Sequence, residues 1–300
     1  MADCDIAWLS WGEPGRQPLV LVHGGAAHAW WWSFTAPLLA DTHHVVALDL
    51  SGHGDSGRRE KYRFALWAAE ALAVAHSLPS EAKPILVGHS MGGMVTMFAA
   101  QQPDADLAAA IAVDAPLRTS TGRSRRTYGR SRWYRTREEA VARFRPLPQQ
   151  PTAEPSLVRH VAEHSVTAAP EGWTFKFDPR VFADGQPDRP ADLGADMARV
   201  RCPFGVVVAE RGVVPAPDRE RLAEFARGGP NRPPLLLHRD PRRLPPPDVR
   251  PPPRTGRRGQ AAGRGRGPRR GRGGVAVSGS RGGGGRGRRR PGRRAGRCGR

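Results

Sequence analysis

The stretch PILVGHSMG, residues 84–92, decides how this chain is interpreted. An apolar run typical of a buried strand leads directly into Ser90, which has a glycine two positions to either side, and a helix-compatible run follows at 94–100. A sharp turn from strand to helix forces the residue at its apex into a strained backbone conformation, and small neighbours let the two elements approach. The stretch predicts a nucleophile elbow with Ser90 as the exposed nucleophile. The alternative is a glycine-rich turn that happens to carry a serine.

The charge of the chain is concentrated at one end. The formal net charge of the 300 residues is +20, and residues 231–300 hold 22 arginines against only Asp240 and Asp248, so residues 1–230 are electrically balanced. Three widely spaced cysteines argue against a disulfide framework. The N-terminus has acidic residues where a signal peptide has basic ones, and no apolar run reaches membrane-spanning length. We expect a soluble cytoplasmic protein without a membrane partner.

Apolar runs alternate with helical patterns through most of the chain. Near-continuous apolar strands separated by helices indicate an α/β fold with a doubly wound, mostly parallel sheet. Residues 117–196 are rich in arginines and aromatics and are broken by prolines, which indicates a helical cap inserted between core residues 1–116 and 197–229. Residues 230–300, rich in Arg, Gly and Pro, are expected to be a disordered low-complexity tail. Strands are expected at 6–9, 19–22, 45–50, 84–87, 110–113 and 203–209, and helices near 67–74, 94–100 and 219–227.

Four motifs, in this order, resemble the α/β-hydrolase family. Residues 23–25 (HGG) follow a strand and are similar to the family's H-G-x oxyanion loop, and residues 49–56 (DLSGHGDS) are similar to its D-x-x-G-x-G-x-S segment. Residues 88–92 match the nucleophile elbow, and Asp114 ends the next strand. The resemblance covers residues 6–229, cap included. It implies a serine hydrolase that acts on a small ester, or on a related acyl or C–C bond, without a cofactor or a metal.

The resemblance also implies roles for individual residues. Ser90 would attack a carbonyl carbon, and the backbone N–H groups of Gly25 and Met91 would donate to the developing oxyanion. Three residues just past the oxyanion loop are candidates to line the substrate pocket, with packing under the cap as the alternative: His28, Trp30 and Trp31.

The acid and the base of the triad are less evident. The family usually places the acid in a G-E-x-D-type turn after the strand at 203–209, where this chain has Glu210 and then glycine at the aspartate position, 212. Some members place it one strand earlier, so Asp114 is favoured over Glu210. The base should be a histidine after the last strand, but only His238 lies beyond His164, and its surroundings do not match the family pattern.

A shift of reading frame explains the missing base. If the codons of residues 239–250 are read one nucleotide later, they permit Glu-Ile-Pro-Asp-Ala-Tyr-His-His-Leu-Met-Phe-Asp, which has the family's I-P-x-A-x-H spacing. The next codons, 254–263, permit an apolar helix. We therefore hypothesise that the reading frame slips between residues 228 and 238 and that this chain has lost most of its hydrolase activity with the catalytic histidine. One alternative is a non-catalytic protein whose genuine tail binds nucleic acid, although the tail has no aromatic residue for base stacking. Another is that His238 reaches Ser90 from the altered loop.

Two further patterns resemble ligand-binding motifs but are interpreted as structural. Residues 52–57 (GHGDSG) satisfy a dinucleotide-binding pattern, but they fall inside the hydrolase segment. Residues 160–164 (HVAEH) satisfy a zinc-protease pattern, and we interpret them as a solvated helix face rather than a metal site.

Overall fold

The computed structural model of the chain describes residues 4–117, 131–146, 149, 153–182, 197–209, 212, 214–227, 235–236 and 269–273. Its elements in chain order are β1 (Ile6–Trp11), β2 (Pro18–Val22), the 3₁₀ helix η1 (Ala29–Trp32), α1 (Ala36–Leu39), β3 (His44–Leu48), α2 (Phe64–Ser77), β4 (Ile85–His89), α3 (Met91–Ala100), β5 (Ala109–Val113), α4 (Arg137–Ala142), α5 (Pro155–His164), β6 (Val166–Ala169), β7 (Gly172–Phe175), η2 (Pro179–Phe182), η3 (Met197–Arg199), β8 (Phe204–Val207), α6 (Ala216–Arg227), β9 (Leu235–Leu236) and β10 (Arg269–Gly273).

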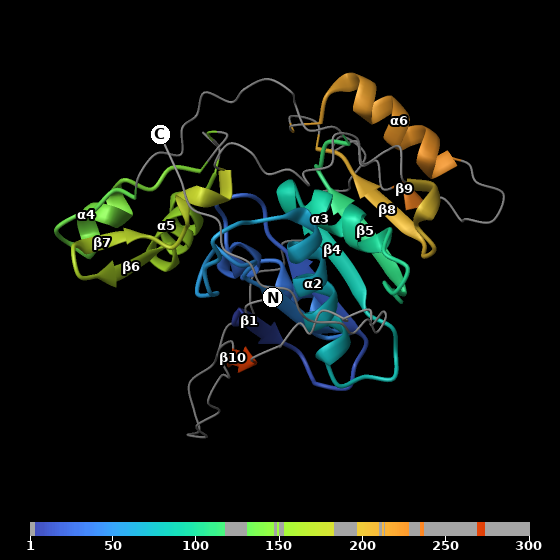
Figure 1. Cartoon of the computed structure of the whole chain (residues 1–300), viewed down its shortest axis with the longest axis horizontal. Coiled ribbons are helices and arrows are strands. Elements are labelled where there is room, and N and C mark those ends of the chain that lie inside the picture. The colour runs from blue at the N-terminus through green and yellow to red at the C-terminus, as the bar shows by residue number, and fades with distance from the viewer. Residues whose placement is uncertain are drawn as a thin grey trace, which may run out of the picture.

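The large sheet is mostly parallel, as the apolar runs predict. It has eight strands in the order β10-β1-β3-β2-β4-β5-β8-β9. The strands from β3 to β9 in this order pair in parallel, and β1 pairs antiparallel with both β3 and β10. Because parallel strands end at the same edge of a sheet, the segments that follow β2, β3, β4, β5 and β8 meet at one edge (Figure 1).

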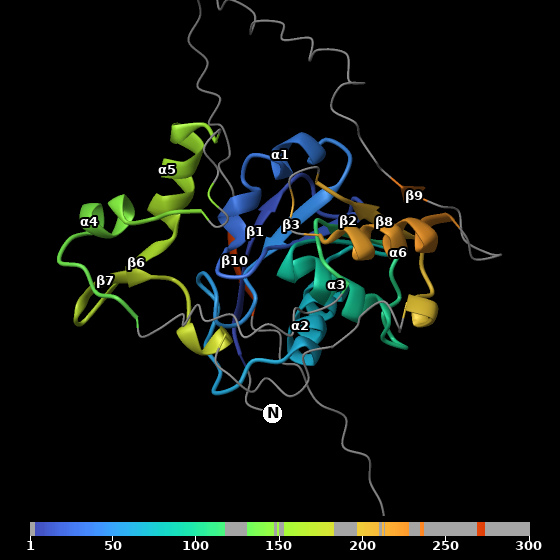
Figure 2. The same ribbon diagram turned by 90° about the horizontal axis from the view of Figure 1, so that it is seen from above.

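Side chains on each central strand alternate between two covered faces. On β2, Val20 and Val22 join the apolar cluster that contains residues of α2, α3 and α6, whereas Leu19 and Leu21 join the cluster with residues of η1 and α1. Figure 2 shows α1 on one side of the sheet and α2 and α3 on the other. The fold is therefore doubly wound.

One face of β4 and β5 is only half covered. Leu86 and Ala110 are fully buried against α2, α3 and their neighbours. On the opposite face, Ile85, Val87 and Ile111 are half-buried, and Val87 pairs with Ile111. The described helical segments that contact this face, η1 and α1, pack against β1, β2 and β3. We call Ile85, Val87 and Ile111 the half-buried strip.

The segment between β5 and β8 forms a separate group of elements beside the sheet. Helices α4 and α5 pack with the antiparallel pair β6 and β7, and Figure 1 shows this group at the left of the sheet. We call residues 131–182 the inserted segment. The segment contains helices, as expected for the cap, and in addition a hairpin, which the sequence did not predict because its strands are four residues each and carry no clear alternation.

Two short parts of the basic C-terminal stretch form strands. Residues 235–236 (β9) extend the sheet beside β8, and residues 269–273 (β10) pair with β1. The rest of the predicted tail lies outside the described residues. No helix in the described part of the chain is both long and apolar enough to span a bilayer.

Candidate active site

Ser90 occupies a strained turn at the carboxyl end of β4. Its backbone angles are φ 53° and ψ −117°, in the left-handed half of conformational space that costs a non-glycine residue about 1–3 kcal/mol. The Ser90 N–H donates to the Val113 carbonyl at 2.9 Å, and the Ser90 carbonyl accepts from the Met94 N–H at 3.1 Å. β5 and α3 therefore hold the strained turn from both sides, which is the geometry of a nucleophile elbow.

Glycines bring the start of α3 against the end of β2. A Cβ built on Gly92 would collide with the backbone carbonyl oxygens of Val22 and His23, so no side chain fits there. Met91 is the first residue of α3, and its Sδ would lie 3.5 Å from a Cβ built on Gly25. Gly25 and Met91, whose N–H groups are the predicted oxyanion donors, are therefore close neighbours.

The buried ring of His23 fixes the loop after β2, which is the predicted oxyanion loop. Its Nδ1–H donates to the Gly24 carbonyl at 2.7 Å, and its Nε2 accepts from the Leu50 N–H at 3.1 Å. These two bonds require the neutral ring, and burial lowers the pKa of His23 to about 4. His23 thus ties the loop after β2 to the segment after β3.

Asp114 follows β5 and lies beside the turn after β8. Its N–H donates to the Val207 carbonyl at 2.7 Å, and its Oδ1 accepts from the Ala209 N–H at 3.4 Å. A Cβ built on Gly212 would fall onto the Asp114 carboxylate. The Asp114 carboxylate therefore occupies the space that a side chain at position 212 would fill.

No imidazole is hydrogen-bonded to the Ser90 hydroxyl within the part of the chain that the structure describes. The ring of His89 lies beside the loop after β2, with its Nδ1 3.1 Å from a Cβ built on Gly24. The other two triad candidates, Glu210 and His238, lie outside the described residues. The structure thus brings together Ser90, Gly25, Met91 and the strand end that carries Asp114.

A sequence model of the alpha/beta hydrolase fold matches residues 17–179, which is more than half of the chain. The chain belongs to the alpha/beta hydrolase fold family. Local relatives include polyneuridine aldehyde esterase of Rauvolfia serpentina, 42% identical over 82 residues (26% of this chain and 31% of the relative). The dihydrolipoyllysine-residue acetyltransferase component of the acetoin cleaving system of Pseudomonas putida is 38% identical over 92 residues (31% of this chain and 25% of the relative).

A solved structure supports the same fold over a longer span. The thioesterase domain from the curacin biosynthetic pathway superposes with a TM-score of 0.63 at 20% identity, covering 77% of this chain and 88% of that domain. The curated relatives, by contrast, are matched over only about a third of their length or less.

In this α/β hydrolase, His28 connects the core to the inserted segment. The Ser165 hydroxyl donates to the Val161 carbonyl at 2.7 Å, so it must accept the 2.8 Å bond from His28 Nε2–H. Burial lowers the pKa of His28 well below its ordinary value, which keeps the ring neutral. Its Nδ1 is therefore a bare acceptor, and this buried atom has no hydrogen-bond partner among the described residues.

The histidines of residues 160–164 pack against the core, so their interpretation as a solvated helix face is wrong. The His164 ring stacks on Trp30 with centroids 3.6 Å apart and 6° between the planes, and His160 Nε2 bonds to the Ser33 hydroxyl at 3.2 Å. Both rings face η1 because the inserted segment folds back onto the core. Among the described residues, no group of three or more His, Cys, Asp or Glu is arranged to hold a metal ion.

The dinucleotide-like loop surrounds a protein carboxylate. Buried Asp49 accepts from the Asp55 N–H at 2.8 Å and from the Ala29 N–H at 2.6 Å. A Cβ built on Gly54 would collide with this carboxylate, and burial raises the pKa of Asp49 to about 6. Residues 52–57 therefore wrap a side chain of the core where a nucleotide site would hold a phosphate.

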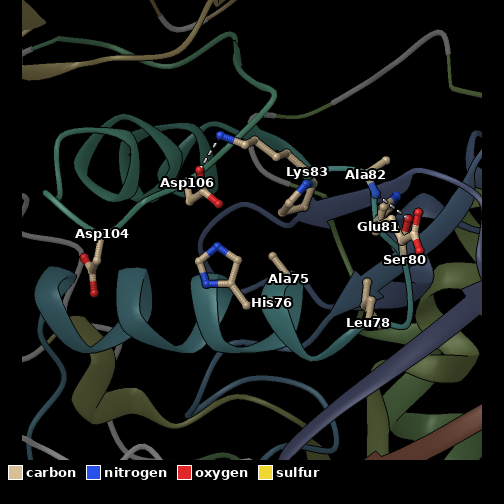
Figure 3. Close-up of a pocket in the computed structure, with 11 residues that line it drawn as sticks. Ala75, His76, Leu78, Ser80, Glu81, Ala82, Lys83, Asp104 and Asp106 are labelled. Atoms are coloured by element: carbon tan, nitrogen blue, oxygen red, sulfur yellow. Dashed lines mark hydrogen bonds and ion pairs between the residues drawn. The ribbon is translucent and has the colours of Figure 1, made fainter.

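The hollow in Figure 3 is at the opposite edge of the sheet from Ser90. It encloses about 400 Å³ and is lined by residues at the amino ends of β2 and β4, including Pro18 and Pro84. Its charged rim contains the Lys83–Asp106 ion pair at 2.6 Å. Because Ser90 lies at the carboxyl end of β4, this hollow does not serve the elbow.

Proposed function

We propose that the fold is that of a serine hydrolase for small carboxylic esters, with Ser90 as the nucleophile. The observation that carries the proposal is the strained backbone of Ser90 at the β4–α3 junction, next to Gly25 and Met91. Ser90 Oγ would attack the ester carbonyl carbon and pass its proton to a base, while the two backbone N–H groups stabilise the oxyanion. Expulsion of the alcohol would leave an acyl-serine, which water then hydrolyses.

Asp114 is the acid in this proposal. Its carboxylate fills the space of a side chain at position 212, which is the aspartate position in the usual family turn. Glycine at 212 leaves that space open, so the acid is supplied from β5 instead of from the turn after β8. This geometry favours Asp114 over Glu210.

The base, we propose, is encoded in the shifted frame. Two observations support this. β9 pairs in parallel with β8 at Leu235 and Leu236, which favours a slip after Leu236. The half-buried strip on β4 and β5 is an apolar surface of the kind that a further amphipathic helix covers, and the shifted codons 254–263 permit such a helix. The chain as written would then lack its general base and turn over slowly, since loss of a triad member costs several orders of magnitude.

External imidazole tests the site in the chain as it exists. If Ser90 and the oxyanion donors are intact, added imidazole can accept the serine proton in place of the missing side chain. We expect imidazole to accelerate p-nitrophenyl acetate hydrolysis by about 10-fold or more, a fraction of the ~10²–10⁴ that a positioned base provides.

The matched control is Ser90→Ala, measured at the same imidazole concentrations to subtract direct catalysis by imidazole. Equal rates for the parent chain and Ser90→Ala at every imidazole concentration would contradict the proposal. A His238→Ala variant separates the remaining alternative, because loss of the imidazole-independent rate would assign the base to His238.

A further inference from the structure

Phe182 lies directly over the oxyanion loop. A Cβ built on Gly25 would lie 2.7 Å from Cζ of Phe182 and 3.4 Å from its Cε1. The same point is 3.5 Å from the Met91 Sδ. The Phe182 ring therefore lies against Gly25, and the Met91 side chain lies beside the same glycine.

The core holds η2, and with it Phe182, in place. Asp178, just before η2, donates its N–H to the Gly52 carbonyl at 2.9 Å and accepts from the Tyr62 hydroxyl at 2.8 Å. Arg180 Nη2 pairs with the Asp178 carboxylate at 2.6 Å. Val181 is 1% exposed within the core cluster. These contacts fix the direction from which the Phe182 ring approaches the site.

The strand order decides which part of an ester meets this ring. Gly25 follows β2 and Asp114 follows β5, so they flank Ser90, which follows the central strand β4. A base held by Asp114 must also protonate the leaving alcohol, so the alcohol lies on the β5 side. The carbonyl oxygen points to the β2 side, toward the Gly25 N–H, so the acyl group has to pass beside the loop after β2, which Phe182 covers.

We propose that Phe182 is the wall of the acyl site and restricts the substrate to esters of short acyl chains, such as acetyl esters. This inference rests on the proposed function of Ser90. It goes beyond that function because it assigns acyl-length specificity to one side chain of the inserted segment. A longer acyl chain would have to displace a ring that η2 holds in contact with Gly25.

The first test compares acyl lengths in the full chain with imidazole present. The ratio of kcat/KM for p-nitrophenyl butyrate to that for the acetate cancels the efficiency of the imidazole. We expect Phe182→Ala to raise this ratio about 10-fold or more, since methylene groups in an apolar site are each worth roughly that factor, with Phe182→Leu intermediate. The control is Trp133→Ala, an exposed aromatic elsewhere in the inserted segment, which should leave the ratio unchanged.

The second test does not depend on activity. Gly25→Ala should lower Tm in the parent chain, because the new Cβ meets the Phe182 ring, and should lower it less in a Phe182→Ala background. No difference between the backgrounds, or a butyrate-to-acetate ratio that Phe182→Ala leaves unchanged, would overturn the assignment of Phe182. Absence of any Ser90-dependent hydrolysis, combined with the expected coupling in Tm, would instead refute the proposed function and leave the contact established.

Discussion

At the scale of single residues, Asp114 and a side chain at position 212 compete for the same space. The exchange of the two positions tests whether they supply one carboxylate. Asp114→Gly should lower the imidazole-dependent rate by about 10-fold or more, because loss of a triad acid is costly. Gly212→Asp alone should lower Tm, since two carboxylates would overlap and repel each other.

The double variant Asp114→Gly with Gly212→Asp should regain both rate and Tm relative to the single variants. The measurements are initial rates with p-nitrophenyl acetate and thermal unfolding by circular dichroism. A double variant that folds but is as slow as Asp114→Gly would argue against a shared acid position. Glycine suits position 114 because the Asp114 φ is 46°, in the left-handed region.

At the scale of elements, stacked rings join α5 to η1. His164→Ala removes the ring that lies on Trp30, a contact worth about 0.5–1.5 kcal/mol. We expect the backbone amides of α5 to exchange hydrogen faster in this variant, because the helix is held less firmly to the core. Hydrogen exchange followed by mass spectrometry measures the effect.

The matched control for this contact is Arg159→Ala on the same helix. Arg159 pairs with Glu163 at 2.9 Å, and its side chain is 77% exposed, so its removal should change exchange little. If both variants exchange equally, the ring contact does not hold α5 in place.

The elements of the core were predictable from sequence, and the contacts of the inserted segment were not. Apolar runs such as 19–22 indicate a buried parallel strand, because nearly all side chains of such a strand are covered. The glycines around Ser90 indicate a tight turn. His164 on Trp30 and Phe182 on Gly25 join residues far apart in the chain. Their local sequence patterns do not indicate these contacts, so residues 160–164 match a solvated helix face and Phe182 is not distinguished from other aromatic residues of the segment. Glycine at 212 was noticeable, but its relation to Asp114 needed the β5–β8 pairing.

At the scale of the whole molecule, we propose one cause for the half-buried strip and for the loss of the catalytic base. Deletion of one nucleotide between codons 236 and 239 would restore the shifted frame. We expect the corrected chain to hydrolyse p-nitrophenyl acetate without imidazole, about 10²–10⁴ times faster than the present chain. It should also have a higher Tm and bind less of a fluorescent hydrophobic dye, because a new helix covers Ile85, Val87 and Ile111.

The control for this correction replaces by alanine only the histidine that the shifted frame permits at codon 245. That chain should keep the higher Tm and the lower dye binding but lose the activity gain. The nucleotide sequence tests the hypothesis first: a stop codon in the shifted frame before codon 265, or no His codon across 245–247, would contradict it.

The strained backbone of Ser90 has a consequence for the evolution of this gene. A serine held at φ 53° lowers the stability of the folded chain, and it is retained by selection only while it contributes to catalysis. Once the base is lost, glycine at this position would be both more stable and no less fit. In a lineage that has carried the frame slip for a long time, we therefore expect the serine at position 90 to be among the first residues of the site to be replaced.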